Sequence, residues 1–306
     1  MKDLIVIGAG PAGLTAGLYA VRAGLDVSVY EKNVYGGQVT STPEVENYPS
    51  VQKVSGFEFA NNIYTQTVSQ GVKMEFDEVL GIEDRGDHKI VKTSSGDVET
   101  RTVIIANGVE RRKLGVKGEQ EFTMKGVTYC ATCDGAFFKG QDVAIVGGGN
   151  TALEDALDLS NTSSKVYLIH RGDHFTGQKV LQDAVIAREN IEIISNSVVE
   201  EIAGDTNVKE IIVKSQIDGS TKSINVKGVF VAIGLIPNNG MFGDVIDLDK
   251  HGYIISDDSC KTNVEGVYVA GDCRTKFLRQ IITAASDGAV ASVQAVNYVN
   301  QNVVQY

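Results

Sequence analysis

The sequence predicts an α/β fold made of two similar three-layer domains, the second inserted into the first. Three observations lead to this prediction. An apolar run followed by closely spaced glycines occurs at residues 4–13, and the same pattern returns at residues 142–152. A third strand-and-helix segment, residues 262–299, lacks that pattern and is therefore expected to complete the first domain.

Length and composition set the outer limits. The chain has 306 residues, which suggests about two domains. Its 33 glycines and 4 prolines favour tight turns in α/β units over disorder. The net charge of −11 argues against a nucleic-acid partner, because phosphate contacts need a basic surface. No apolar run approaches the ~18 residues that span a bilayer, and residues 3–10 already read as strand and turn, so we expect no membrane segment, no signal peptide and a cytoplasmic location.

The first glycine pattern, Gly8-x-Gly10-x-x-Gly13, has the context of a dinucleotide-binding unit. A strand is expected before it, a helix over residues 14–24 and a second strand over residues 26–30, ending at Glu31. In such a Rossmann-like unit the pyrophosphate lies at the helix N-terminus and the terminal acid binds a ribose hydroxyl. The segment therefore predicts a dinucleotide site.

The second pattern repeats the first. Gly147 and Gly149 match the first two glycines, and Ala152 stands where the third would be. His170 follows Gly147 by 23 positions, the spacing that separates Glu31 from Gly8. Two dinucleotide sites in one chain are explained most economically by hydride transfer between a flavin and a nicotinamide.

The C-terminal segment supplies a strand that ends at Gly271-Asp272, where a carboxylate could bind a polyol chain. The alternative for Asp272 is a simple N-cap of the segment that follows. We expect the first domain to comprise residues 1–112 and 239–306, with the inserted domain at residues 113–238. Residues 111–118 and 232–240 have the charge, glycine and proline expected of the two linkers.

Cys130 and Cys133, in "YCATCDG", could form a redox pair, half of a zinc site or a structural disulfide. A CxxC pair stabilises one thiolate, and the adjacent Asp134 can pass a proton during thiol exchange, although it could instead begin an Asp-Gly turn. Zinc needs two further ligands, and Cys260 and Cys273 are neither a CxxC nor near a suitable histidine. Four cysteines are too few for a disulfide framework in a reducing compartment. We therefore favour a redox pair and expect no metal.

The ordered motifs resemble the low-molecular-weight thioredoxin reductases of the FAD-dependent pyridine nucleotide-disulfide oxidoreductase superfamily. The resemblance runs over essentially the whole chain. It rests on the glycines at 8–13, "GGQ" at 36–38, "EVENYP" at 44–49, "CATCDG" at 130–135, "GGGNTA" at 147–152, "FVAIG" at 230–234, "GVYVAGD" at 266–272 and "RQIITAASDG" at 279–288.

The resemblance implies a homodimer that uses FAD as cofactor, NAD(P)H as co-substrate and thioredoxin as protein substrate. The residues implied for FAD are Gly8, Gly10, Pro11, Ala12, Gly13, Glu31, Lys32, Gly36, Gly37, Gln38, Asn47, Val79, Ala106, Gly108, Gly271, Asp272, Arg279, Gln280 and Ile281. Those implied for NAD(P)H are Gly147, Gly149, Asn150, Thr151, Ala152, His170, Arg171, Ile233 and Gly234.

The resemblance also implies the catalytic roles. Cys130 and Cys133 would form the redox-active disulfide of the inserted domain, with Cys133 facing the flavin and Cys130 attacking the disulfide of thioredoxin. Asp134 would be the acid/base. A domain rotation is implied as well, because the flavin cannot meet nicotinamide and protein substrate in one arrangement.

One segment departs from the family. NADPH-using members carry "HRRxxFR" after the second strand of the nucleotide domain, whereas this chain has "HRGDHFTG" at 170–177. Arg171 is retained, but Gly172 and Thr176 replace two arginines, and neither can clamp a 2′-phosphate. His170 also replaces the acid that would favour NADH. A smaller departure is Asn107, where the family usually has threonine, and we expect little consequence from it.

Three electron donors follow from this segment. NADH, accepted or preferred over NADPH, is the first expectation. NADPH with help from Arg171 and His174 is the second, and a reduced ferredoxin or a deazaflavin is the third, although the intact "GGGNTA" weighs against it. Two rival functions stay open: a non-catalytic redox-sensing module, and a related flavoprotein that reduces another dithiol carrier.

Overall fold

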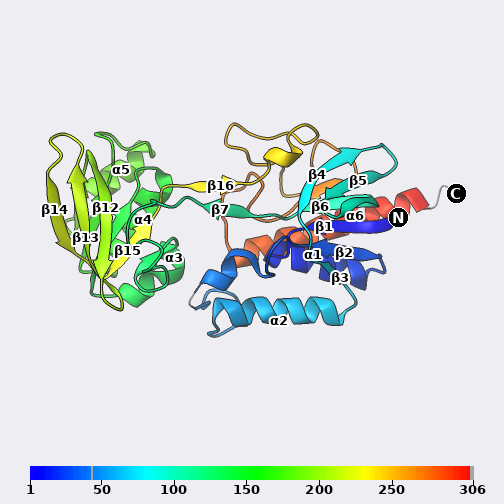
Figure 1. The fold of residues 1–306 in the computed structure, drawn as a ribbon, viewed down its shortest axis with the longest axis horizontal. Coiled ribbons are helices and arrows are strands. Elements are labelled where there is room, and N and C mark those ends of the chain that lie inside the picture. Colours follow the sequence, from blue (N-terminus) through cyan, green and yellow to red (C-terminus); the bar gives the residue numbers. More distant parts are fainter. Residues whose placement is uncertain (43, 304–306) are drawn as a thin grey trace. The chain divides into compact units, whose positions relative to one another are not determined.

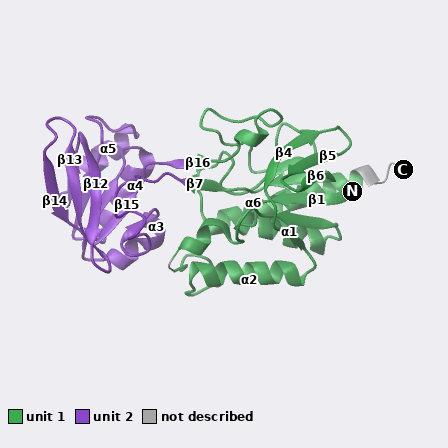
Figure 2. Ribbon diagram, in the orientation of Figure 1, with its two compact units in different colours: residues 1–110, 236–306 green, residues 111–235 purple. Residues whose placement is uncertain are grey.

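A computed structural model describes residues 1–42 and 44–303 of the chain (Figure 1). The chain forms two compact units, one of Met1–Glu110 with Ile236–Tyr306 and one of Arg111–Leu235 (Figure 2). The assignment of FAD to the first unit and of NAD(P) to the second stays a prediction.

The first unit is a parallel sheet with helices, extended by an antiparallel hairpin. Its elements are β1 (Lys2–Ile7), α1 (Pro11–Arg22), β2 (Val27–Tyr30), η1 (Gly37–Ser41), α2 (Gly56–Ser69), β3 (Lys73–Glu75), β4 (Val79–Asp84), β5 (Lys89–Thr93), β6 (Gly96–Ile105), η3 (Gly240–Phe242), β17 (Val267–Val269) and α6 (Ile281–Val303). The strand order is β3-β2-β1-β6-β5-β4, and β17 pairs in parallel with the last residues of β6. The C-terminal segment therefore completes the first sheet.

The apolar pattern of the sequence explains this sheet. The run at residues 4–7 is buried on both faces, as expected for a central parallel strand. Helices α1 and α6 pack on one another beside it, because Gly288 brings their backbones close: a Cβ there would lie 2.2 Å from the Ala12 carbonyl oxygen. This contact fixes the start of α6 against the first glycine turn.

The second unit repeats the parallel sheet and adds a small antiparallel one. Its elements are β8 (Val127–Thr128), α3 (Ala131–Asp134), η2 (Gly135–Phe138), β9 (Asp142–Val146), α4 (Asn150–Ser160), β10 (Lys165–Ile169), α5 (Lys179–Ile186), β11 (Ile191–Ile194), β12 (Ser197–Gly204), β13 (Val208–Ser215), β14 (Thr221–Asn225) and β15 (Gly228–Val231). The parallel order is β11-β10-β9-β15-β8, and β12-β13-β14 form the antiparallel sheet. The predicted α/β fold class with two Rossmann-like units is confirmed.

The chain passes between the units at residues 110–111 and 235–236. These crossings lie in β7 (Val109–Arg111) and β16 (Leu235–Pro237), which pair as a two-stranded sheet. No helix within the described ranges is both long and apolar enough to cross a membrane.

Candidate active site

The first glycine turn joins β1 to α1 and leaves its backbone open at one position. Gly8 has φ +104°, and a Cβ there would lie 2.4 Å from the carbonyl oxygen of Ala106. At Gly13 a Cβ would lie 1.8 Å from the Gly8 oxygen, so only glycine fits. A Cβ at Gly10 would meet nothing within 4 Å, and Gly10 caps α1 without a side-chain hydrogen bond. The open N-terminus, with Pro11 at its start, fits the pyrophosphate of a dinucleotide.

Glu31 ends β2 beside this turn. Its Oε2 accepts a hydrogen bond from the Ala9 N–H at 3.0 Å, and its Oε1 accepts one from the Asn33 N–H at 3.0 Å. The carboxylate thus ties the strand end to the glycine turn. Each oxygen accepts one such bond, so a second lone pair on each stays able to accept a ribose hydroxyl.

The "GGQ" segment lies against the same turn. The Gly36 N–H donates to the Ala9 carbonyl at 2.7 Å, and a Cβ at Gly37 would lie 3.3 Å from the Cα of Gly10. The Gln38 side-chain amide donates to the Val109 carbonyl, which holds the start of η1 beside the end of the sheet. These contacts bring three separate predicted FAD segments together.

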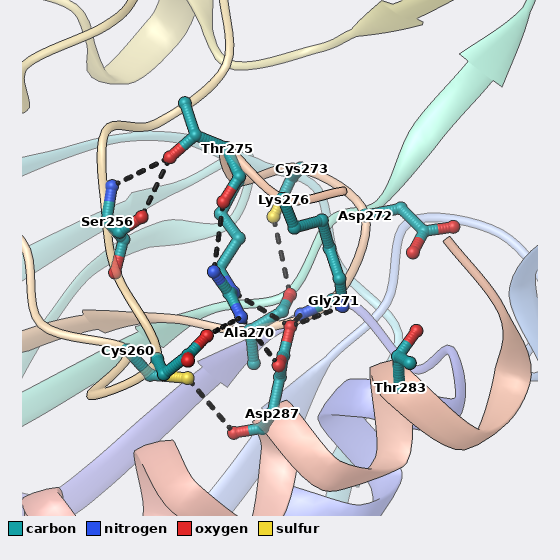
Figure 3. Close-up of polar contacts among 12 residues, drawn as sticks. Ser256, Cys260, Ala270, Gly271, Asp272, Cys273, Thr275, Lys276, Thr283 and Asp287 are labelled. Carbon is teal, nitrogen blue, oxygen red and sulfur yellow. Dashed lines mark hydrogen bonds and ion pairs between the residues drawn. The ribbon is translucent and has the colours of Figure 1, made fainter. Parts of the chain in front are cut away.

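Figure 3 shows a buried ion cluster that anchors the next predicted segment, which follows β17. Asp287, on α6, accepts a hydrogen bond from the Gly271 N–H at 3.0 Å. It also pairs with the guanidinium of Arg274, at 2.9 Å to each oxygen, and with Lys276 Nζ at 2.8 Å. Burial raises the pKa of Asp287, but the bonds from Arg274 and Lys276 outweigh it and hold that pKa below its ordinary value. The cluster fixes Gly271, whose φ is +82°, and hence the adjacent Asp272.

The Arg279 side chain stabilises the loop that begins at Asp272. Its guanidinium donates to the carbonyls of Asp272 at 3.2 Å and Arg274 at 3.2 Å. The neighbouring Gln280 accepts a hydrogen bond from the Asn47 amide at 3.1 Å, which joins "EVENYP" to the start of α6 at Ile281. Because α6 begins nine positions after Asp272, the N-cap interpretation of Asp272 is wrong.

The remaining predicted FAD residues lie at the same end of the sheet with one exception. Ala106 and Gly108 follow β6, and Lys32 follows Glu31. Val79, the first residue of β4, is buried in the core on the other side, so only its backbone could face a cofactor.

The second glycine turn reproduces the first. Gly147 has φ +158°, and a Cβ there would lie 2.4 Å from the Ala232 oxygen, the same distance as at Gly8. It would also lie 2.7 Å from the Cβ of Ala152, which replaces the third glycine. Gly149 caps α4, which begins with Asn150 and Thr151, and again no side chain bonds to the cap. Ile233 and Gly234 follow β15 beside this turn.

His170 ends β10 but does not take the place that Glu31 has in the first unit. Its ring lies over Gly148, so close that a Cβ there would lie 2.2 Å from Nδ1. Nε2 lies 2.7 Å from the carbonyl oxygen of His174. Nε2 therefore carries the proton in this contact, and Nδ1 faces the glycine turn as an acceptor when the ring is neutral.

The segment after His170 folds back over the turn. The Gly148 carbonyl accepts bonds from the Thr176 N–H at 2.8 Å, the Thr176 hydroxyl at 3.2 Å and the Gly177 N–H at 3.2 Å. The Gln178 N–H donates to Asn150 Oδ1 at 2.7 Å. Arg171, in this segment, is exposed. The residues that differ from the family pattern therefore lie in the loop that folds over the second glycine turn.

Cys130 and Cys133 are joined by a disulfide at the N-terminus of α3, which confirms that they form a pair. Cys130 is the N-cap residue, and its sulfur accepts a hydrogen bond from the Cys133 N–H at 3.2 Å. Cys260 and Cys273 are free and buried, and burial raises the pKa of each to about 12. Neither thiol is ready to ionise, in contrast to a reactive pair.

Asp134, the last residue of α3, is 7% exposed. Its Oδ2 accepts a hydrogen bond from the Thr128 hydroxyl, while its Oδ1 is buried and has no hydrogen-bond partner among the described residues. Burial raises the pKa of Asp134, against smaller lowering effects of Thr128 and Arg111. Asp134 is also the N-cap residue of η2, which begins at Gly135, but its side chain makes no capping hydrogen bond, so its acid/base role stays a prediction.

A second buried carboxylate supports the strand that leads to the disulfide. Glu119 accepts bonds from the N–H groups of Leu114 and Gly115 at 2.8 and 2.7 Å, and from the Tyr129 hydroxyl at 2.9 Å. Burial and the Glu119 charge raise the pKa of Tyr129 to about 12. Tyr129 therefore stays neutral and fixes the residue before Cys130.

Sequence reasoning missed Thr128, Glu119, Arg274, Lys276 and Asp287. Asp287 had one usable signal: it is a lone charge in the small and apolar run "TAASDGAVAS". The others carried none, because their partners are distant in the chain or reached through loops.

The comparisons with known proteins agree with this geometry. The family model described as "Pyridine nucleotide-disulphide oxidoreductase" matches residues 2–288. The chain belongs to the pyridine nucleotide-disulphide oxidoreductases. A thioredoxin reductase of Listeria innocua serovar 6a is 41% identical over 300 residues, covering 98% of this chain and 94% of the relative.

Solved structures of this family show the same likeness. The thioredoxin reductase of Streptococcus pyogenes MGAS5005 is 41% identical, covers 98% of this chain and 99% of its own, and superposes with a TM-score of 0.94. A ferredoxin-flavin thioredoxin reductase of Clostridium acetobutylicum is 30% identical, covers 98% of each chain and has a TM-score of 0.54. The resemblance to thioredoxin reductases and the oxidoreductase class expected from the sequence are confirmed. Family membership implies the use of a flavin and a nicotinamide nucleotide.

Proposed function

We propose that the protein is a thioredoxin-disulfide reductase that passes electrons from a nicotinamide nucleotide, through FAD, to the Cys130–Cys133 pair and on to a thioredoxin. The observation that carries the proposal is the disulfide itself, placed at a helix N-terminus beside a buried carboxyl, Asp134. An acid held next to a disulfide is what thiol–disulfide exchange needs.

FAD fits the first unit. The open Gly10 position and the uncapped start of α1 leave room and backbone donors for a pyrophosphate, and Glu31 lies where a ribose diol would be bound. Asp272, fixed by the Asp287 cluster, is suited to a polyol chain, and Asn47 and Gln280 close the site from the other side. When bound, FAD supplies two-electron transfer between the nicotinamide and the disulfide.

The protein's own residues handle sulfur and protons. The Cys133 N–H donates to the Cys130 sulfur and so favours a thiolate there. Burial raises the pKa of Asp134 and so favours its protonated form beside the pair more than in an exposed carboxyl. Cys130 as the sulfur that attacks thioredoxin and Cys133 as the sulfur that faces the flavin follow the family assignment.

NADH is the donor that the nucleotide turn favours. No arginine fork is available at Gly172 or Thr176 for a 2′-phosphate, so the extra phosphate of NADPH has no bidentate partner at these two positions. The one retained arginine, Arg171, is exposed. The complete glycine turn at Gly147–Gly149 argues against a donor that is not a nucleotide.

Ferredoxin is the alternative donor. The relative from Clostridium acetobutylicum is named a ferredoxin-flavin thioredoxin reductase, so the shared fold serves such a donor in that protein. A homodimer and a cytoplasmic location complete the proposal, both by analogy with the family.

Steady-state assays with the purified protein test the proposal. With added thioredoxin, NADH should support turnover with a higher kcat/KM than NADPH, and the protein should be yellow. Cys133→Ser should abolish thioredoxin reduction while flavin bleaching by NADH persists. A colourless protein that does not take up FAD, or full turnover in Cys133→Ser, contradicts the proposal.

A further inference from the structure

The hydroxyl of Thr128 holds one oxygen of Asp134 and leaves the other free. Thr128 lies on β8 and is 9% exposed, and its Oγ1 donates to Asp134 Oδ2. The Cys130 N–H in turn donates to Thr128 Oγ1 at 3.4 Å. The threonine therefore links the backbone of the first cysteine to the carboxyl beside the second.

We propose that Thr128 is a positioning residue for the proton transfer at the disulfide: it fixes Asp134 so that Oδ1 is the oxygen that exchanges the proton. Two observations carry this. Oδ1 is buried and without a hydrogen-bond partner in the described part of the chain, so it has no competing contact. Oδ2 already accepts the hydrogen bond from Thr128, so the oxygen that faces away from Thr128 is the one left to carry the proton.

The proton and electron balance defines the step, which rests on the proposed function for its electron source. FAD, when bound and reduced, would supply the two electrons that open the Cys130–Cys133 bond. One sulfur takes the proton from Asp134 Oδ1 and becomes a thiol, the other stays a thiolate, and Asp134 becomes a carboxylate. The thiolate then attacks the thioredoxin disulfide and displaces a substrate thiolate. As the enzyme thiol returns its proton to Asp134, its sulfur attacks the mixed disulfide, which releases the second substrate thiolate and restores the starting state.

The groups around Asp134 predict the sign of the pH effect. The hydrogen bond from Thr128 and the charge of Arg111 both lower the pKa of Asp134, against the larger effect of burial. On α4, which lies against α3, burial and the charges of Asp158 and Glu154 raise the pKa of Asp155 to about 7, so Asp155 is a second titrating group that the test must separate from Asp134. Removing the Thr128 hydroxyl should therefore raise the pKa of Asp134 and leave that of Asp155 unchanged.

The test compares Thr128→Val, which keeps the shape and loses the hydroxyl, with Thr128→Ser, which keeps the hydroxyl. Opening of the disulfide by dithiothreitol is followed across pH as the ratio of variant to wild-type rate, a readout that needs neither flavin donor nor thioredoxin. At neutral pH, dithiothreitol should open the disulfide of Thr128→Val about tenfold more slowly than that of the wild type. This is a fraction of the roughly 10²–10⁴-fold that general acid catalysis contributes, because the acid is misplaced and not removed. The ratio of the Thr128→Val rate to the wild-type rate should rise with pH. Asp134 has the lower pKa in the wild type, so the wild type loses the catalytic proton first. Thr128→Ser should stay near wild type at every pH.

The outcomes separate cleanly. A Thr128→Val ratio that is low but flat with pH shows a merely structural role and overturns the proposal, as does a Thr128→Ser variant equally impaired. Asp155→Asn should leave the profile of the wild type in place, and a shift there would assign the titration to Asp155. If the wild type reduces no thioredoxin, the proposed function fails, yet the dithiothreitol profile still decides the role of Thr128. A circular dichroism melt of each variant checks folding, and if Thr128→Val unfolds, Thr128→Ala removes the same hydroxyl and takes its place in the comparison.

Discussion

The His170 ring occupies the space above Gly148 that a side chain would need: Nδ1 lies 2.2 Å from the ideal Cβ position. The nucleotide turn of the second unit thus depends on a glycine that the usual dinucleotide pattern does not require, since the matching position in the first turn is Ala9. The difference follows from the residue at the strand end. Glu31 reaches the backbone N–H of Ala9 with its carboxylate, whereas His170 covers the turn with its ring.

Gly148→Ala should therefore disrupt the nucleotide turn. The new Cβ must displace His170 and the loop tied to the Gly148 carbonyl, at a cost of about 1–3 kcal/mol in the free energy of unfolding. We expect flavin bleaching by NADH to be lost, while chemically reduced enzyme still reduces thioredoxin. Gly149→Ala is the matched control, because its Cβ would meet only Thr176 Oγ1, at 3.9 Å. Gly149→Ala should have the same free energy of unfolding as the wild type but a higher KM for NADH. Equal free energies of unfolding for Gly148→Ala and Gly149→Ala would contradict this account.

Arginine at position 176 should restore NADPH use. Thr176 is exposed, and its backbone bond to Gly148 survives the change. A charged bidentate contact to a 2′-phosphate contributes about 1.5–3 kcal/mol, so Thr176→Arg should raise kcat/KM for NADPH by about tenfold to a hundredfold. NADH kinetics should change little. Thr176→Gln has similar reach without the charge, and a gain in that variant would exclude the charge as the cause.

Much of the fold and of the site was predictable because it rests on local patterns. Both glycine turns, the strand after each helix and the Cys130–Cys133 pair follow from spacing alone, and the Gly8 and Gly147 turns have the same close contact, at 2.4 Å. The ribose role assigned to His170 by its spacing stays a prediction. The way its ring seats on Gly148 could not be foreseen, because it depends on backbone bonds from a loop six residues further along.

The ion cluster was not predictable for a related reason. Asp287, Arg274 and Lys276 meet only because Gly271 and the loop after it turn back onto α6. Asp287 stands out in the sequence only as a lone charge in a small and apolar run, and nothing there marks Arg274 and Lys276 as its partners. The Thr128–Asp134 bond likewise needs the strand β8 to run beside the helix that carries the disulfide.

Asp287→Asn should destabilise the first unit and weaken flavin binding. The change removes the ion-pair partner of buried Lys276 and leaves buried Arg274 with only the exposed Asp258, 3.9 Å away, which costs about 3–5 kcal/mol. Urea unfolding and the rate of FAD release measure the two effects. The exposed pair Lys179–Asp183 offers a matched control, since Asp183→Asn should cost no more than about 0.5 kcal/mol.

The same cluster predicts a pH dependence. Asp287 has a pKa below its ordinary value, so its stabilisation is fully present above the unfolded-state pKa and is lost as pH falls through the folded-state pKa. The stability gap between wild type and Asp287→Asn should therefore be constant near neutral pH and close in acid below about pH 4. A gap that widens in acid would contradict the ion-pair interpretation.

Anaerobic reoxidation of the reduced flavin tests the central claim, that the Cys130–Cys133 pair relays electrons to thioredoxin. Enzyme reduced photochemically, without any nucleotide, is mixed with oxidised thioredoxin, and the return of the flavin absorbance is recorded. The wild type should regain its yellow colour rapidly, whereas Cys130→Ser and Cys133→Ser should stay bleached. Return of the colour in either variant at the wild-type rate would show that electrons reach thioredoxin by another path.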